Sequence, residues 1–157
     1  MKKIITLALA ATMIMSLAAC GAKTPVAEEK PGDTMSLSEI FTDILDVENM
    51  PAIADIEINK DNFESFLFIP PIEGAEALAS EGMISAVAHS AVLLRLPEGA
   101  DAAAVAKSIE ENANPRKWVC VEAEKTTVSV HGNTILLVMS FTDTADAITA
   151  NFDNLWA

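Results

Sequence analysis

The sequence predicts an α+β fold, in which amphipathic helices pack against an antiparallel sheet of about four strands. Residues 36–47 place apolar side chains at helical spacing. Gly132-Asn133 separates two runs rich in β-branched residues, a pattern typical of a two-residue hairpin turn. The predicted order is helix, unassigned segment, strand, helix, strands and helix, which indicates helices layered on an antiparallel sheet.

The N-terminus predicts a lipoprotein signal peptide. Lys2 and Lys3 precede residues 4–19, which carry no charge. As a helix these residues would reach roughly 24 Å, short of the apolar core of about 30 Å that a permanent span crosses. That length suits a signal peptide. Leu17-Ala18-Ala19-Cys20 resembles a bacterial lipobox, which implies diacylglycerol on the Cys20 sulfur, cleavage before Cys20 and palmitate-type acylation. An uncleaved anchor and an ordinary secreted protein are the alternatives.

Three segments follow from this interpretation. Residues 1–19 are the expected signal peptide, residues 20–35 the lipidated cysteine and a flexible tether, and residues 36–157 a single α+β domain. The tether mixes Pro, Gly, Thr and charge without an apolar period, so it lacks the surface needed to fold. We therefore expect a lipid-anchored, extracytoplasmic protein on the outer face of the bacterial cytoplasmic membrane.

The first half of the domain gives one clear element. Ser36 and Glu39 form a capping-box pattern at the start of helix 36–47. Residues 52–83 stay mostly unassigned: Asn59 is a candidate cap for a short turn before Pro70-Pro71, and residues 73–82 fit one helical turn or a loop.

The second half is better patterned. Residues 86–96 read as a strand, Asp101 caps a helix that Pro115 stops, and residues 118–124 alternate like a strand. One face of this last predicted strand carries Val119, Val121 and Ala123. After the hairpin, whose second arm is apolar on both faces and therefore predicted to be central, Asp143 caps the closing helix.

The charge excludes some partners. Loss of Lys2 and Lys3 with the signal leaves eight basic against 23 acidic residues, a net charge of −15. Such a surface repels nucleic acid and anionic lipid headgroups, so we expect no nucleic-acid partner and attachment to the membrane through the N-terminal lipid alone. Excess acid also suits a cationic partner or divalent ions.

The order of segments resembles a known family. A lipobox, an acidic tether, a capped helix, the "VSVHGNTILLVMS" hairpin and a closing "DTADAITANF" helix are similar to the bacterial domain of unknown function 4358 family. The likeness covers about residues 36–156, best over 84–153, and rests on hydrophobic pattern. It implies a small envelope lipoprotein and brings no catalytic residues or cofactor with it.

Few residues are candidates for chemistry. The chain has no G-x-S-x-G elbow, no paired cysteine spacing and no metal-binding or phosphate-binding motif, and we expect no cofactor. His89 and His131 are the two possible bases, both in predicted strands. Lipidation of Cys20 leaves Cys120 without a disulfide partner, so it is expected to be a small buried hydrophobe. Trp118 becomes a candidate contact residue if it is exposed.

These observations favour a non-enzymatic binding or interaction module with an envelope protein or a small ligand as its partner. A thiol-dependent enzyme using Cys120 is the first alternative, with His89 or His131 as the base. A cation-binding envelope protein is the second.

Overall fold

The computed structural model describes residues 29–157, so the predicted signal peptide, Cys20 and most of the predicted tether lie outside the described residues. One five-stranded antiparallel sheet organises the domain, which confirms the α+β class and gives one strand more than expected. The spatial order of its strands is β1-β2-β3-β5-β4. Their bounds are Ile53–Ile58 (β1), Glu76–Gly82 (β2), Ser90–Arg95 (β3), Lys125–His131 (β4) and Thr134–Ser140 (β5).

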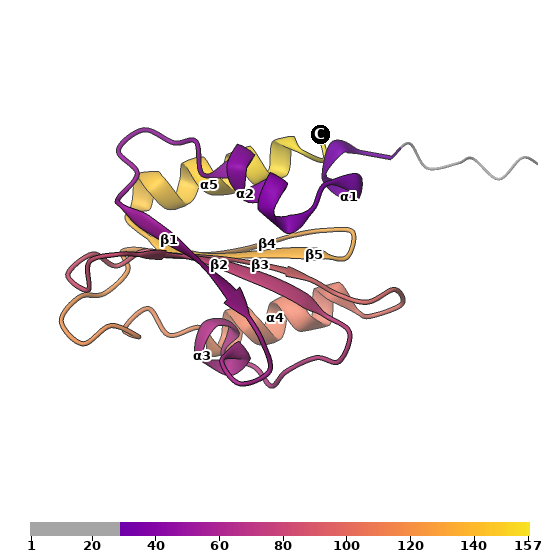
Figure 1. Cartoon of the computed structure of the whole chain (residues 1–157), viewed down its shortest axis with the longest axis horizontal. Helices are drawn as coiled ribbons and strands as arrows, with labels where there is room; N and C mark the ends of the chain where they lie inside the picture. Colours follow the sequence, from indigo (N-terminus) through magenta and orange to yellow (C-terminus); the bar gives the residue numbers. More distant parts are fainter. Residues whose placement is uncertain (1–28) are drawn as a thin grey trace, which may run out of the picture.

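Helices cover both faces of the sheet (Figure 1). One face carries α2 (Leu37–Ile44) and α5 (Thr142–Asn154), with the short α1 (Pro31–Thr34) beside them. The other face carries α3 (Phe63–Leu67) and α4 (Ala102–Asn112). We refer to them as the α2/α5 face and the α3/α4 face.

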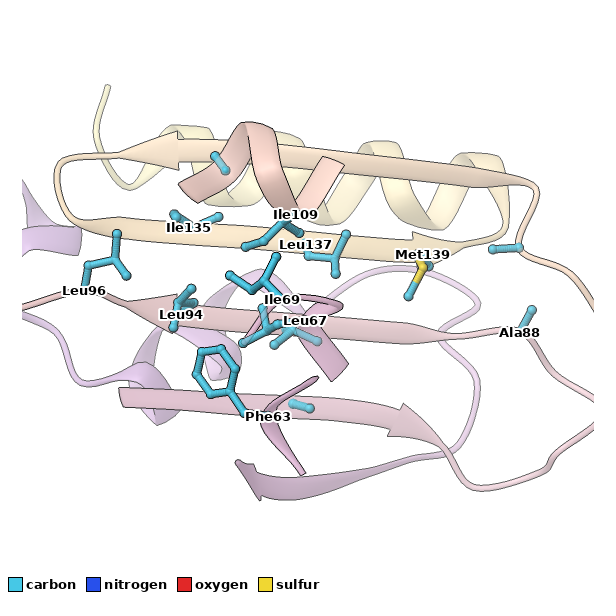
Figure 2. Packing of buried hydrophobic residues seen from close by; sticks show 14 residues of the cluster. Phe63, Leu67, Ile69, Ala88, Leu94, Leu96, Ile109, Ile135, Leu137 and Met139 are labelled. Atoms are coloured by element: carbon cyan, nitrogen blue, oxygen red, sulfur yellow. The ribbon is translucent and has the colours of Figure 1, made fainter. Parts of the chain in front are cut away.

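Alternation along the strands divides the core in two. On the α3/α4 face, Leu94 of β3 and Leu137 of β5 pack with Ile109 of α4 and Leu67 of α3 (Figure 2). On the α2/α5 face, neighbouring strand residues such as Leu93 pack against the two longer helices. All seven residues of β5 are buried, which confirms that the second arm of the hairpin is a central strand.

Local sequence signals explain several element boundaries. The Ser36 hydroxyl accepts a hydrogen bond from the Glu39 amide, and the Glu39 carboxylate accepts one from the Ser36 amide at 2.8 Å, so the predicted capping box starts α2. The predicted Asp101 cap of α4 is also present. Gly132 turns the hairpin with a φ of 56°, in the left-handed region that glycine adopts readily.

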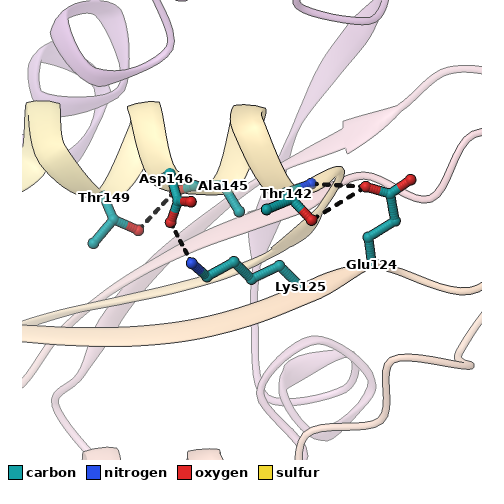
Figure 3. A network of polar contacts seen from close by, with 6 residues as sticks. All are labelled: Glu124, Lys125, Thr142, Ala145, Asp146 and Thr149. Carbon is teal, nitrogen blue, oxygen red and sulfur yellow. Dashed lines mark hydrogen bonds and ion pairs between the residues drawn. The ribbon is translucent and has the colours of Figure 1, made fainter.

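The closing helix begins differently from the prediction. α5 starts at Thr142, so Asp143 lies in its first turn and the prediction that Asp143 is the cap is wrong. The Glu124 carboxylate takes the capping role from outside the helix and accepts a hydrogen bond from the Thr142 amide at 3.0 Å (Figure 3). Lys125 pairs with Asp146 on the next turn. The cap is a long-range contact, which explains why local spacing did not reveal it.

Three segments differ from the prediction or had no assignment. Residues 73–82 form neither a helical turn nor a loop, because β2 occupies most of them and pairs with both β1 and β3. Residues 118–124 are not a strand: they form a loop closed by a hydrogen bond from the Ala123 amide to the Pro115 carbonyl, and Val119 is fully exposed. The strand predicted over residues 86–96 begins only at Ser90.

The end of the predicted tether packs on the domain. Gly32 of α1 lies against the Trp156 ring so closely that a side-chain carbon at this position would overlap it. The Trp156 Nε1–H donates to Asp33 Oδ1 at 2.7 Å. The Lys30 backbone amide, and after it the Trp156 indole, hold the pKa of Asp33 below its usual value. Residues 31–34 thus belong to the folded unit.

Candidate functional site

The strongest candidate surface lies at one end of the sheet, where β2 ends and β3 begins. We define the tip as residues 83–86 and 117–120, which come from the β2–β3 connection and the α4–β4 loop at the left of Figure 1. Met83 and Ile84 are 67% and 59% exposed, and Val119 is fully exposed. Large apolar side chains this accessible are typical of a surface that contacts something else.

A pocket of about 420 Å³ opens within the tip. It is lined by Ser85, Ala86, Lys117, Trp118, Val119 and Cys120. The two chain segments that form it are more than 30 positions apart in the sequence, so the fold creates this pocket. Its size and mostly apolar lining are those of small-ligand sites and of pockets that receive one anchor side chain.

An ion pair fixes the base of the tip. Lys117 Nζ lies 2.7 Å from Glu81 Oε1 and 2.9 Å from Ser90 Oγ, and Ser90 Oγ also donates to Glu81. The Lys117 and Glu81 side chains are only 14% and 15% exposed. Charge-assisted hydrogen bonds of this kind hold the α4–β4 loop against β2 and β3.

Two aromatic rings complete the environment of Lys117. Its ammonium lies 5.1 Å from the ring centroids of both Phe66 and Trp118, within the range of a cation–π contact. Burial lowers the pKa of Lys117, while Glu81 acts in the opposite direction. Trp118 is half-buried, so it borders the pocket while contacting Lys117.

Cys120 is exposed, and the prediction that it is buried was wrong. The reason is the loop: its ends are tied by the Lys117 contacts and by the Arg116–Glu122 ion pair at 2.8 Å, so residues between them bulge into solvent. A strand in this segment would have packed every second residue inward. The loop instead presents the thiol beside Val119.

The structure does not bring either histidine to Cys120. His89 precedes β3, is fully buried and has its Nδ1 2.9 Å from Ser140 Oγ, which lies on the last residue of β5. Its Nε2 has no hydrogen-bond partner among residues 29–157. Burial, followed by the charge of Lys117, lowers the pKa of His89 to about 4, so the ring is neutral at pH 7.

His131 lies at the other end of the domain, at the last position of β4. Its Nε2 is 2.9 Å from Asp153 Oδ1, and Ser129 Oγ donates to the same oxygen at 2.7 Å. The ring stacks on Trp156 with centroids 5.0 Å apart. His131 and Trp156 therefore help to attach α5 to the edge strand β4, and neither borders the tip.

Sequence reasoning missed Glu81, Ser90 and the two exposed apolar residues Met83 and Ile84. Glu81 fell in the unassigned segment, and nothing local indicated that it would meet Lys117, 36 positions later. The one available signal was the adjacency of Lys117 and Trp118 in a segment bounded by Pro115.

No family model matches the chain, and comparison with curated proteins and with solved structures gives no match. Among residues 29–157 no group of three or more His, Cys, Asp or Glu side chains is arranged to hold a metal ion. None of the helices in this part of the chain combines the length and the apolar character that a membrane span requires.

The exposure of Cys120 leads to a labelling prediction. In the Cys20→Ala variant, Cys120 is the one remaining thiol. We expect a maleimide to modify it in the folded protein at a rate within about tenfold of that in denaturant, because an exposed side chain needs no unfolding to react. Quenching the maleimide reaction at a series of times, followed by mass spectrometry, measures both rates. Labelling seen in denaturant alone would contradict the exposed loop.

Proposed function

We propose that this chain is a lipid-anchored extracytoplasmic lipoprotein that acts as a non-enzymatic binding module, with the tip as its binding surface. The observation that carries the proposal is the exposure of Met83, Ile84 and Val119 around a pocket bordered by Trp118. A rigid ion-paired base supports this surface, so it is preorganised for a partner, which lowers the entropy lost on binding.

The position of residue 30 in the fold supports such a role. Residue 30 lies beside the C-terminus, since Lys30 Nζ is 3.4 Å from the Ala157 carbonyl. Asp33 lies near Gly132, at the hairpin end of the sheet. The tip is at the opposite end, about 20 Å away along the six residues of β3. A lipid on Cys20 would therefore be attached through the end of the domain that lies opposite the tip.

Site-specific cross-linking in intact cells tests the binding surface. A photo-reactive phenylalanine analogue at Val119 should give an adduct with an envelope protein, while the same analogue at Lys107, exposed on α4 and outside the tip, should give none. Met83→Asp should reduce the Val119 adduct at least tenfold. Equal adducts at both positions, or none at Val119, would contradict a tip that binds protein.

A second experiment tests the anchor separately. Cells fed an alkyne-labelled palmitate should incorporate the label into the chain, and Cys20→Ala should abolish incorporation. The membrane pellet should retain the wild-type chain in high salt, because acyl burial, and not charge, holds it there. Incorporation of the label that persists in the Cys20→Ala variant would contradict the interpretation of residues 17–20 as a lipobox.

A thiol-dependent enzyme is the second candidate, favoured by one observation: Cys120 is exposed at the mouth of the pocket. Neither histidine is positioned to activate it, so a base would have to come from elsewhere. Cys120→Ser separates the candidates. It should leave the Val119 adduct unchanged for a binding module and remove the activity of a thiol enzyme.

A further inference from the structure

The free edge of β1 is a second feature with a functional meaning. β1 is the outermost strand and pairs only with β2 among residues 29–157. The Met83 amide donates to the Ala52 carbonyl at 2.9 Å, so residues 52 and 83 form a hydrogen-bonded pair. Because such pairs alternate along an antiparallel ladder, the peptide groups of Ile53, Asp55 and Glu57 point to the free side.

Little of this edge is used within the domain. Asn62 Nδ2 donates to the Glu57 carbonyl at 3.2 Å and covers the far end. The peptide groups of Ile53 and Asp55 remain at an edge that no strand of the described chain pairs. An unpaired row of donors and acceptors is a template for an additional strand.

The two faces of β1 next to this edge differ in character. On the α2/α5 face, a groove of about 710 Å³ runs between α2 and β1, and three carboxylates line it: Asp43, Asp46 and Asp55. Glu57 follows Asp55 on the same side of the strand, and both are exposed. No lysine or arginine lines this groove.

On the α3/α4 face, an apolar pocket of about 390 Å³ lies between β1, α3 and the segment that precedes β2. Its apolar walls include Ile58, Phe63 and Ile72. A strand placed beside β1 would direct alternate side chains to its two faces, one set over the carboxylates and the other toward this pocket.

We propose that β1 binds an extended, basic segment of a partner protein by strand addition, with Lys or Arg at alternate positions over the carboxylates and apolar residues between them. The negative charge beside the free edge favours a basic segment over a second copy of this chain. Antiparallel pairing with the β1 of a second copy, centred on residue 55 or 56, would place Asp55 opposite Asp55 or Glu57 of that copy, and like charges directly across a strand pair are destabilising. The inference depends neither on the tip nor on the lipid anchor.

The probe is a fluorescent peptide, Lys-Val-Lys-Val-Lys-Val-Lys, titrated against the full chain in mild detergent at 50 mM salt. We expect saturable binding that weakens at least tenfold at 300 mM salt, and no binding of the peptide with Glu in place of Lys. Bound peptide should slow hydrogen exchange in residues 53–57, measured by mass spectrometry.

Asp55→Pro is the decisive variant. It removes an outward N–H and leaves the pairing of β1 with β2 intact, since proline is tolerated on an edge strand where its N–H would face solvent. We expect Asp55→Pro to weaken binding of the peptide at least tenfold more than Asp55→Asn does. Asp55→Asn removes the charge and keeps the N–H. An unchanged melting temperature in both variants checks the fold.

Three outcomes would overturn the proposal. One is no binding of the Lys–Val peptide at 50 mM salt. Another is binding that Asp55→Pro and Asp55→Asn affect equally, which indicates a charge effect without strand addition. The third is slowed exchange at residues 53–57 in the chain alone with a concentration-dependent increase in mass, which indicates pairing of two copies.

Discussion

Lys117→Met is expected to lower the free energy of unfolding by about 3 kcal/mol, because it leaves the largely buried Glu81 carboxylate without its counter-charge. The substitution also removes the hydrogen bond to Ser90 and the contacts with Phe66 and Trp118. Urea unfolding followed by circular dichroism at pH 7 measures the change. The α4–β4 loop should also become more sensitive to proteolysis, since Lys117 is one of its attachments.

Two comparisons isolate the ion pair. Lys107→Met removes a lysine from the exposed Lys107–Glu111 pair, at 3.7 Å, and should change stability by no more than about 0.5 kcal/mol. The double variant Lys117→Met, Glu81→Leu should recover part of the loss, because no uncompensated charge then remains buried. Equal effects of Lys117→Met and Lys107→Met would show that the Glu81–Lys117 pair contributes little.

The largest pH effect should come from His89. Its pKa is about 4 in the folded protein, against a usual value of 6.5 for histidine, so below pH 6.5 the unfolded chain takes up a proton that the folded chain excludes. Stability from this group is therefore complete above pH 6.5 and is lost as the pH falls from there toward 4. Between pH 7.5 and pH 5 the loss should be about 2 kcal/mol.

His89→Gln isolates this contribution, since glutamine does not titrate and can still bond to Ser140. The quantity to compare is the change in unfolding free energy between pH 7.5 and pH 5 for each protein. The contribution of the carboxylates to this change is common to both proteins and cancels in the comparison. Stopping at pH 5 avoids the isoelectric point near 4.3. Parallel pH profiles for the two proteins would mean that the His89 ring protonates freely in the folded state.

The elements predicted well are those in which neighbours in sequence are also neighbours in space. The capping box of Ser36 and Glu39, the Asp101 cap and the Gly132 turn are each complete within a few residues, and all three are present. The burial of β5 followed from a run of apolar residues on both of its faces.

The failures involve contacts between distant segments. β1 and β2 carry charges and small residues in place of strong alternation, and their pairing with each other, and of β2 with β3, defines them as strands. Residues 118–124 show the reverse: they alternate like a strand, yet the adjoining attachments at Lys117 and Ala123 hold them as a loop. The exposure of Cys120 and the pairing of Glu81 with Lys117 follow from that loop, so neither was visible in the sequence.

The packing of α1 against Trp156 shortens the predicted tether between Cys20 and the domain. If Cys20 is the anchor and a tether follows it, as proposed, that tether ends at about residue 30 and not at residue 35, because residues 31–34 pack on the domain. The root-mean-square span of a flexible chain grows with the square root of its length, so the volume that the domain explores falls about twofold. The same shortening raises the local concentration of the domain near any partner fixed in the same membrane by about twofold. In a chain anchored at Cys20, the contact between Gly32 and Trp156, which lie near the two ends of the domain's sequence, would therefore influence how often the protein meets its neighbours.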